Sequence, residues 1–108
     1  MLKYTKLLKK MSESNSAASN LTLPGNKTLN GAFRLSVVHG KPVCAYFYLD
    51  SIKGKVVIRH DGDEKIIYKD EDEYSSPLEH LYKSENEYIA ITNNTIYIIS
   101  SRTEVRKI

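Results

Sequence analysis

The chain has 108 residues, enough for one small domain, and its 41% of hydrophobic residues exclude a fully disordered protein. It carries 16 Lys and Arg against 13 Asp and Glu, a formal net charge of +3, and no run of the roughly 18 apolar residues that a membrane span needs. The single cysteine, Cys44, excludes a disulfide framework within the chain and a cysteine-rich zinc site, and it fits a reducing compartment.

The positive charge is concentrated in a leader, residues 1–10, which has four lysines and no acid. The other 12 basic and 13 acidic residues leave residues 11–108 at −1, and residues 61–87 alone hold 10 acids against three lysines. The leader is therefore the candidate contact for nucleic acid or an anionic membrane, through Lys3, Lys6, Lys9 and Lys10. Alternatively, Met11 is the true start of the folded protein and the leader is a disordered extension.

Residues 11–27 are rich in Ser, Asn, Ala and Gly and show no sustained apolar period. We expect a flexible basic and Ser/Asn-rich arm over residues 1–27, followed by a single small domain over residues 28–108.

The domain is predicted to begin with a helix. Thr28 is a candidate N-cap, and Gly40 followed by Pro42 is a typical stop signal. A strand over residues 32–39 is the alternative, because apolar residues there also alternate. The positions expected to share one helix face are Leu29, Ala32, Phe33, Ser36 and Val37.

After Pro42 the apolar period changes to two, which indicates strands. Ser76 and Pro77 predict a short helical turn over residues 77–84, with Leu78, Leu81 and Tyr82 facing inward. The fold class is thus predicted to be α+β, with about five antiparallel strands in hairpins, one covering helix and a short helical turn. The expected strands are residues 43–49, 55–60, 64–69, 88–92 and 95–100, with turns at residues 50–54, Asp61-Gly62-Asp63 and Asn93-Asn94.

No catalytic or metal-binding motif is present in the sequence. We interpret the three histidines as exposed turn residues, with a cluster of His60, His80 and Asp61 as a minor alternative. Cys44 lies in an apolar run and is expected to be an inert buried thiol rather than a nucleophile. The acidic run over residues 70–73 lacks the order of a calcium loop and indicates a solvated loop rather than a cation site. We therefore expect no enzymatic activity, no metal and no cofactor.

The tyrosines are the remaining candidates for a binding surface. Tyr46 and Tyr48 would share one face of a strand and form an aromatic strip, and residues 95–100 would form an exposed edge strand. The candidate interface for another protein or for a second copy is therefore Tyr46, Tyr48, Tyr97 and Thr95. Alternatives are tyrosines packed half in the core and a stacking platform for single-stranded nucleic acid.

An acidic segment with Glu73, Tyr74, Ser76 and Pro77 is followed by the Tyr- and Ile-rich residues 88–100. Over roughly residues 29–100, with weaker similarity around Lys41-Pro42 and residues 46–51, the chain thereby resembles small proteins of the nucleocytoplasmic large DNA viruses, the giant-virus group. The chain departs from the pattern in having no Trp and in having Leu49 before Asp50. The resemblance implies a viral origin, in the virion or the host-cell cytoplasm, and transfers no active-site residue.

Together, these observations predict a non-enzymatic viral structural or protein-binding module that acts through a protein partner or self-association. The alternative is a nucleic-acid-associated protein that binds through its basic leader.

Overall fold

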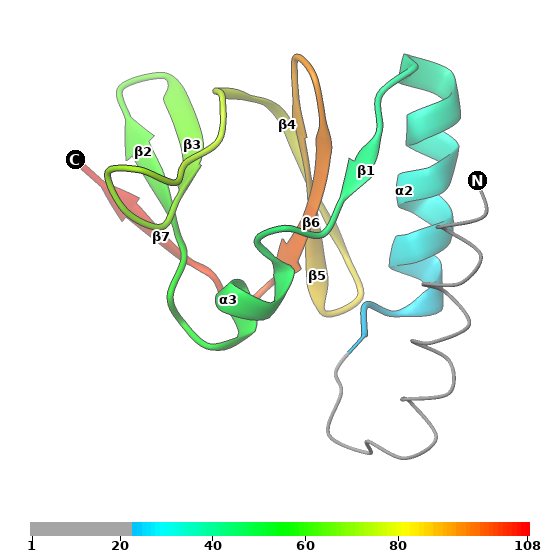
Figure 1. Cartoon of the computed structure of the whole chain (residues 1–108), viewed down its shortest axis with the longest axis horizontal. Helices are drawn as coiled ribbons and strands as arrows, with labels where there is room; N and C mark the ends of the chain where they lie inside the picture. Colours follow the sequence, from blue (N-terminus) through cyan, green and yellow to red (C-terminus); the bar gives the residue numbers. More distant parts are fainter. Residues whose placement is uncertain (1–22) are drawn as a thin grey trace.

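The structure, a computed structural model, describes residues 23–108 and has the predicted α+β fold (Figure 1). Seven strands, one main helix and one short helix lie in this part of the chain. Residues 1–22 of the predicted arm, with its four leader lysines, lie outside the described residues. The elements are α2 (Asn26–His39), β1 (Val43–Cys44), α3 (Tyr48–Ile52), β2 (Val57–Asp61), β3 (Glu64–Tyr68), β4 (Leu78–Ser84), β5 (Glu87–Thr92), β6 (Ile96–Ser100) and β7 (Glu104–Lys107).

The described elements form three layers, with α2 on one side of a four-stranded sheet and a three-stranded sheet on the other (Figure 1). The strand orders are β1-β6-β5-β4 and β3-β2-β7. Most pairings are antiparallel, but β1 pairs with β6 and β2 pairs with β7 in parallel. No helix in this part of the chain is long and apolar enough to cross a membrane.

Two hydrophobic clusters hold the layers together, and the central strands β5 and β6 contribute to both. Because successive side chains of a strand point to opposite faces, one face of each strand packs under α2 and the other against the small sheet. The helix-side cluster consists of Ala32, Tyr48, Ile89, Ile91, Ile96 and Ile98. The inter-sheet cluster consists of Phe47, Val56, Ile58, Ile67, Ala90 and Ile99.

The predicted first helix is confirmed, although it begins two residues before the expected boundary at residue 28. Its N-cap is Gly25 rather than Thr28, and Thr28 is buried in the first turn. Gly40 ends the helix in a left-handed conformation (φ 64°), and its N–H donates to the carbonyl of Ser36.

The hairpin of β5 and β6 is confirmed, but its turn does not use positive φ at the asparagines. The hydroxyl of Thr92 instead accepts hydrogen bonds from the N–H groups of Asn94 (3.2 Å) and Thr95 (3.0 Å). The β2–β3 hairpin is also confirmed, and Gly62 adopts the positive φ (60°) that its tight turn requires.

The predicted strand over residues 43–49 is wrong. Only Val43–Cys44 is extended, and after a turn at Tyr46 and Phe47, closed by the hydrogen bond from the N–H of Tyr48 to the carbonyl of Ala45 (3.0 Å), the chain forms the short helix α3. Tertiary contacts override the strand-like pattern here, because α3 packs on β6, where Ser51 Oγ accepts a hydrogen bond from the N–H of Ser100 (2.8 Å). Phe47 packs in the inter-sheet cluster and Tyr48 in the helix-side cluster. In the loop predicted over residues 50–54, residues 50–52 therefore belong to α3 and only residues 53–54 form a turn, and β2 pairs with β3 and β7 instead.

The predicted helical turn over residues 77–84 is also wrong, because this segment is the edge strand β4. Leu78 and Leu81 both pack against the inter-sheet cluster, although residues three apart in a regular strand face opposite sides. A bulge between Leu78 and His80 inserts one extra residue and restores a common face. The spacing that suggested a helix is thus produced by a bulged strand.

Strand β7 was not predicted. Its sequence is charged, all four of its residues are exposed, and only its parallel pairing with β2 defines it as a strand.

Candidate functional site

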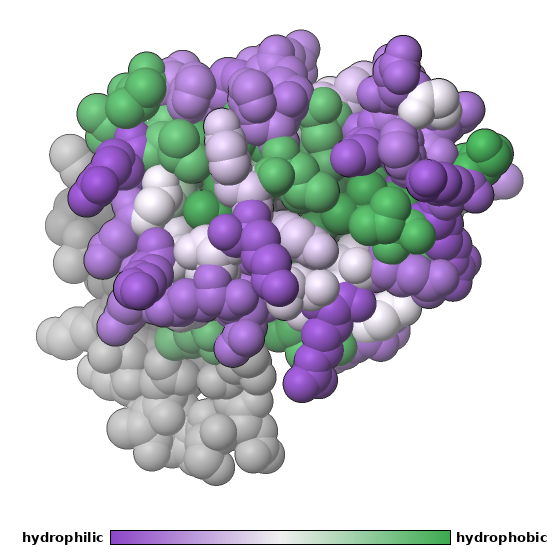
Figure 2. Space-filling model, turned by 180° about the vertical axis from the view of Figure 1, so that it is seen from behind, coloured by the Kyte–Doolittle hydropathy of each residue, from purple (hydrophilic) through white to green (hydrophobic). Residues whose placement is uncertain are grey.

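The outer face of α2 exposes three large apolar side chains: Phe33 (61% exposed), Val37 (84%) and Val38 (71%). In the view from behind (Figure 2), apolar groups reach the surface on the side where α2 lies. The expectation that Phe33 and Val37 face the core is wrong. Leu29 and Ala32 face the core as expected, and Leu35 joins them in place of Phe33 and Val37.

The charges around these side chains are all of one sign along the helix. Lys27 and Arg34 are exposed on α2, and the helix contains no acidic residue. We call Phe33, Val37 and Val38 together with these two cations the α2 face.

The strand β4 forms an open edge of the four-stranded sheet. Its regular part, from His80 to Ser84, pairs on one side with β5, and Tyr82 is 44% exposed. No backbone partner within residues 23–108 occupies its other side. Unpaired backbone donors and acceptors of this kind can pair with another strand.

The edge proposed from sequence, residues 95–100, is not an edge. Strand β6 lies between β1 and β5, and the N–H of Ser100 donates to Ser51 Oγ of α3 (2.8 Å). Tyr97 is half-buried beside Phe47 in the inter-sheet layer, and Thr95 lies in the turn before β6.

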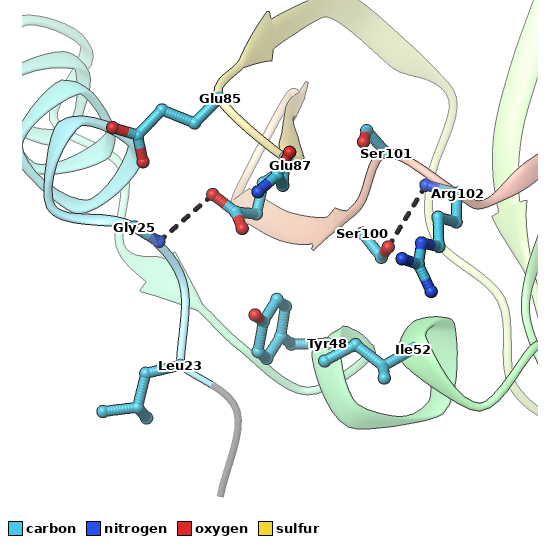
Figure 3. Close-up of a pocket in the computed structure, with 10 residues that line it drawn as sticks. Leu23, Gly25, Tyr48, Ile52, Glu85, Glu87, Ser100, Ser101 and Arg102 are labelled. Carbon is cyan, nitrogen blue, oxygen red and sulfur yellow. Dashed lines mark hydrogen bonds between the residues drawn. The ribbon is translucent and has the colours of Figure 1, made fainter.

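A cleft of about 480 Å³ lies between the start of α2, the helix α3 and the turn that joins β4 to β5 (Figure 3). The ring of Tyr48 projects into it from α3, and Glu87 projects from the opposite wall. Ser100 and Arg102 form a third side, where the N–H of Arg102 donates to Ser100 Oγ (3.1 Å).

Glu87 has a structural role in this cleft. Its Oε1 accepts hydrogen bonds from the N–H of Gly25 (3.2 Å) and the hydroxyl of Thr28 (2.6 Å), both at the start of α2. The helix has no acid in its first turn and no side-chain cap of its own, so the carboxylate complements its positive end from another element. Burial, and secondarily the charge of Glu87, raise the pKa of the Tyr48 hydroxyl, which therefore stays protonated at neutral pH.

Tyr46 and Tyr48 do not form the predicted aromatic strip. Tyr48 is buried in the helix-side cluster, whereas Tyr46 is exposed and its hydroxyl donates to the carboxylate of Glu73. Lys69 Nζ lies 3.0 Å from Glu73 and 3.1 Å from Asp50, so this group links α3 to the end of β3. The hydrogen bond from Tyr46, then that from Lys69, lowers the pKa of Glu73.

The acidic run over residues 70–73 is organised by the side chain of Asp70. Asp70 Oδ1 accepts hydrogen bonds from the N–H groups of Asp72 (2.8 Å) and Glu73 (2.9 Å), which closes a local turn. Between residues 23 and 108, no three His, Cys, Asp or Glu side chains are grouped so as to hold a metal ion.

The sequence signal for the α2 face is the number of apolar residues on this helix, which the sequence analysis assigns to the core. Its apolar residues cover a wider arc of the helix than one sheet face can bury, and the surplus is exposed. The open edge at β4 has no signal in the sequence analysis, because the segment is predicted there to be helical.

No protein-family model matches the chain, and no curated protein and no solved structure is significantly similar to it.

Proposed function

We propose that the protein is a non-enzymatic protein-binding module whose α2 face docks an acidic amphipathic helix of a partner protein. The observation that carries this proposal is the exposure of Phe33, Val37 and Val38 on one helix. Large apolar side chains gathered on the surface are typical of interaction sites, because their contact with water is unfavourable.

The chemistry of the partner follows from the cations beside these side chains. Lys27 and Arg34 have no acidic neighbour on α2, so a partner with carboxylates beside its apolar stripe complements the α2 face. A second copy docking α2 against α2 would bring these cations together, which disfavours self-association here. Apolar anchors at positions i and i+4, such as Phe33 and Val37, suit a helix lying along the surface.

A membrane surface is the competing ligand for a helix with apolar and basic groups. Membrane-bound amphipathic helices rely on a broad apolar face with many cations. The α2 face has three apolar side chains and two cations, and its inner side packs on β5 and β6. A groove on a partner protein therefore suits it better.

The proposal is tested with the full chain and two synthetic helical peptides of roughly 20 residues. Both carry leucines at helical spacing, and they differ only in having Glu or Lys at the flanking positions. We expect the acidic peptide to bind at least about tenfold more tightly in fluorescence anisotropy. The double variant Phe33→Ser/Val37→Ser should lose at least about tenfold in affinity. Val105→Ser, at an exposed apolar position on β7, is the matched control.

Arg34→Glu separates the charge argument from simple hydrophobicity. This variant should weaken the acidic peptide and strengthen the basic one. Equal binding of both peptides to the wild-type chain would refute the proposed partner chemistry. The proposal would be refuted if Phe33→Ser/Val37→Ser bound the acidic peptide as tightly as the wild-type chain does. It would be refuted equally if this double variant lost binding to phosphatidylglycerol vesicles but not to the peptide.

The proposed setting is a large DNA virus, as the resemblance of residues 29–100 implies, with the protein in the particle or in the host-cell cytoplasm. Mass spectrometry of purified particles tests whether the protein lies in the particle. If the protein is absent from the particles, the host-cell cytoplasm is supported. The alternative function, nucleic-acid binding through Lys3, Lys6, Lys9 and Lys10, predicts salt-sensitive binding that a variant starting at Met11 lacks.

A further inference from the structure

We infer that two copies of this chain associate through β4, so that their four-stranded sheets join in one continuous eight-stranded sheet. The two β4 strands run antiparallel about a two-fold axis at Tyr82. This interface is separate from the α2 face, so either proposal can fail while the other stands.

The hydrogen-bond pattern of β4 fixes which of its backbone groups point outward. The β4–β5 turn contains two residues, and Ser84 opposite Glu87 closes it as a hydrogen-bonded pair. Because such pairs alternate in an antiparallel ladder, Tyr82 and His80 also bond to β5. The N–H and C=O groups of Leu81 and Lys83 therefore point to the open side.

A two-fold axis at Tyr82 pairs these outward groups reciprocally. Leu81 lies opposite Lys83 of the second copy, and Lys83 lies opposite Leu81 of the second copy. The two pairs form four backbone hydrogen bonds within His80–Ser84, away from the bulge between Leu78 and His80. The isologous arrangement closes on itself as a dimer.

The side chains of residues 80–84 are compatible with this register. Tyr82 is 44% exposed and stacks on His80 at 5.7 Å between ring centroids. Across the axis, Tyr82 meets Tyr82 of the second copy at a non-hydrogen-bonded position, where side chains of paired strands lie closest. Lys83 faces Leu81 of the second copy rather than another charge. No like-charged pair lies directly opposite within residues 80–84.

The other sheet edges are less suited to this pairing. Strand β1 has two residues, and β7 is a charged strand with all its residues exposed. The outer side of β3 is occupied, because the N–H of Ser75 donates to the carbonyl of Ile67 (2.8 Å) and Tyr74 bridges to Tyr68. Among the described strands, β4 therefore offers the longest open edge with few charges.

The association is expected to be weak, because one pair of short strands buries less than the roughly 1,000 Å² of a stable interface. We expect a dissociation constant between about 1 µM and 1 mM. Sedimentation velocity of the full chain over this concentration range measures it directly.

Lys83→Pro is the decisive variant. Proline removes the outward N–H of Lys83 without breaking a bond to β5, and proline is tolerated on the open side of an edge strand. It should weaken dimerisation at least about tenfold, whereas Lys83→Ala keeps the N–H and should dimerise like the wild type. Circular dichroism verifies that each variant is folded.

Tyr82→Lys is a second variant, for the case in which Lys83→Pro does not fold. It places two ammonium groups opposite each other across the axis and should also weaken dimerisation. In the wild type, hydrogen exchange of the Leu81 and Lys83 amides should slow as concentration rises. A chain that remains monomeric at 1 mM overturns the inference. A folded Lys83→Pro variant that dimerises normally, or a dimer lost only in Phe33→Ser/Val37→Ser, overturns it equally.

Discussion

Replacing Ser51 by Ala tests how the fold closes the side of β6 that β1 leaves open. Strand β1 pairs only with Ile96 and Tyr97, so the N–H of Ser100 needs another acceptor. Ser51 is 2% exposed; its hydroxyl oxygen accepts this hydrogen bond at 2.8 Å, and its O–H donates to the carbonyl of Tyr48 at 2.6 Å. Ser51→Ala removes both interactions with almost no change in volume.

The expected loss follows from burial. Ser100 is 7% exposed, so water does not readily replace the lost acceptor, and a buried donor without a partner costs about 1–3 kcal/mol. The free energy of unfolding of a domain is roughly 5–15 kcal/mol, so the cost of the unpaired Ser100 N–H is a large fraction of the total stability. For a domain of this size, the midpoint of thermal unfolding should fall by about 4–8 °C per kcal/mol.

Urea denaturation followed by circular dichroism measures this difference in the free energy of unfolding. The control is Ser76→Ala, because Ser76 is exposed, and it should change stability by less than about 0.5 kcal/mol. Hydrogen exchange at the Ser100 amide should accelerate in Ser51→Ala alone. If both variants unfold at the same urea concentration, α3 does not seal β6 and the reasoning is refuted.

Three further predictions concern the core, the turn at β4–β5 and the polar group at Tyr46. Ile98→Ala should lower the free energy of unfolding by about 2–5 kcal/mol, measured by urea denaturation. Val105→Ala on exposed β7 should lower it by less than about 0.5 kcal/mol, and similar losses in the two variants would contradict the layer arrangement. Glu85 adopts a positive φ of 53°, so Glu85→Gly should be more stable than Glu85→Ala by about 1 kcal/mol, measured by the same assay. The pKa of Glu73 lies below its usual value of 4.5, so its carboxylate stabilises the folded chain above that pH, and this contribution is lost as the pH falls through the lowered pKa. The stability difference between wild type and Glu73→Gln should therefore be present at about pH 7 and shrink at about pH 2, and a constant difference would exclude the ionised carboxylate as its source.

Local signals predicted the hairpins and the main helix because their information lies within a few residues. Gly62 marks the β2–β3 turn, Gly40 ends α2, and the alternating residues of β5 and β6 lie close together in sequence. These features depend on backbone conformation and period, which do not require knowledge of the rest of the chain.

The errors occurred where contacts between distant segments decide the conformation. The strand-like segment that contains Tyr48 forms the helix α3, whose Ser51 hydrogen-bonds to Ser100 of β6, 49 positions away. The bulge in β4 gives Leu78 and Leu81 a helical spacing although they lie on one face of a sheet. Strand β7 depends wholly on β2 and has no apolar pattern of its own.

The same limitation applies to the candidate surfaces. The sequence identified the apolar residues of α2 but not how many of them the sheet could cover, and Phe33 was therefore assigned to the core. The tyrosines were grouped by an assumed strand that does not exist, so Tyr46 and Tyr48 were expected on one surface although one is exposed and the other buried.

The two parallel pairings have a consequence for how the chain folds. Val43 pairs with Ile96, 53 positions away, and Val57 pairs with Glu104, 47 positions away, whereas the hairpins close short loops. Closing a loop of about 50 residues costs roughly 2 kcal/mol more in entropy than closing a short one, so we expect the hairpins to form first and β7 to dock late. Until it docks, β2 also has an open edge. Refolding yield should therefore depend most on protein concentration during that interval, before the last strand shields β2 from other chains.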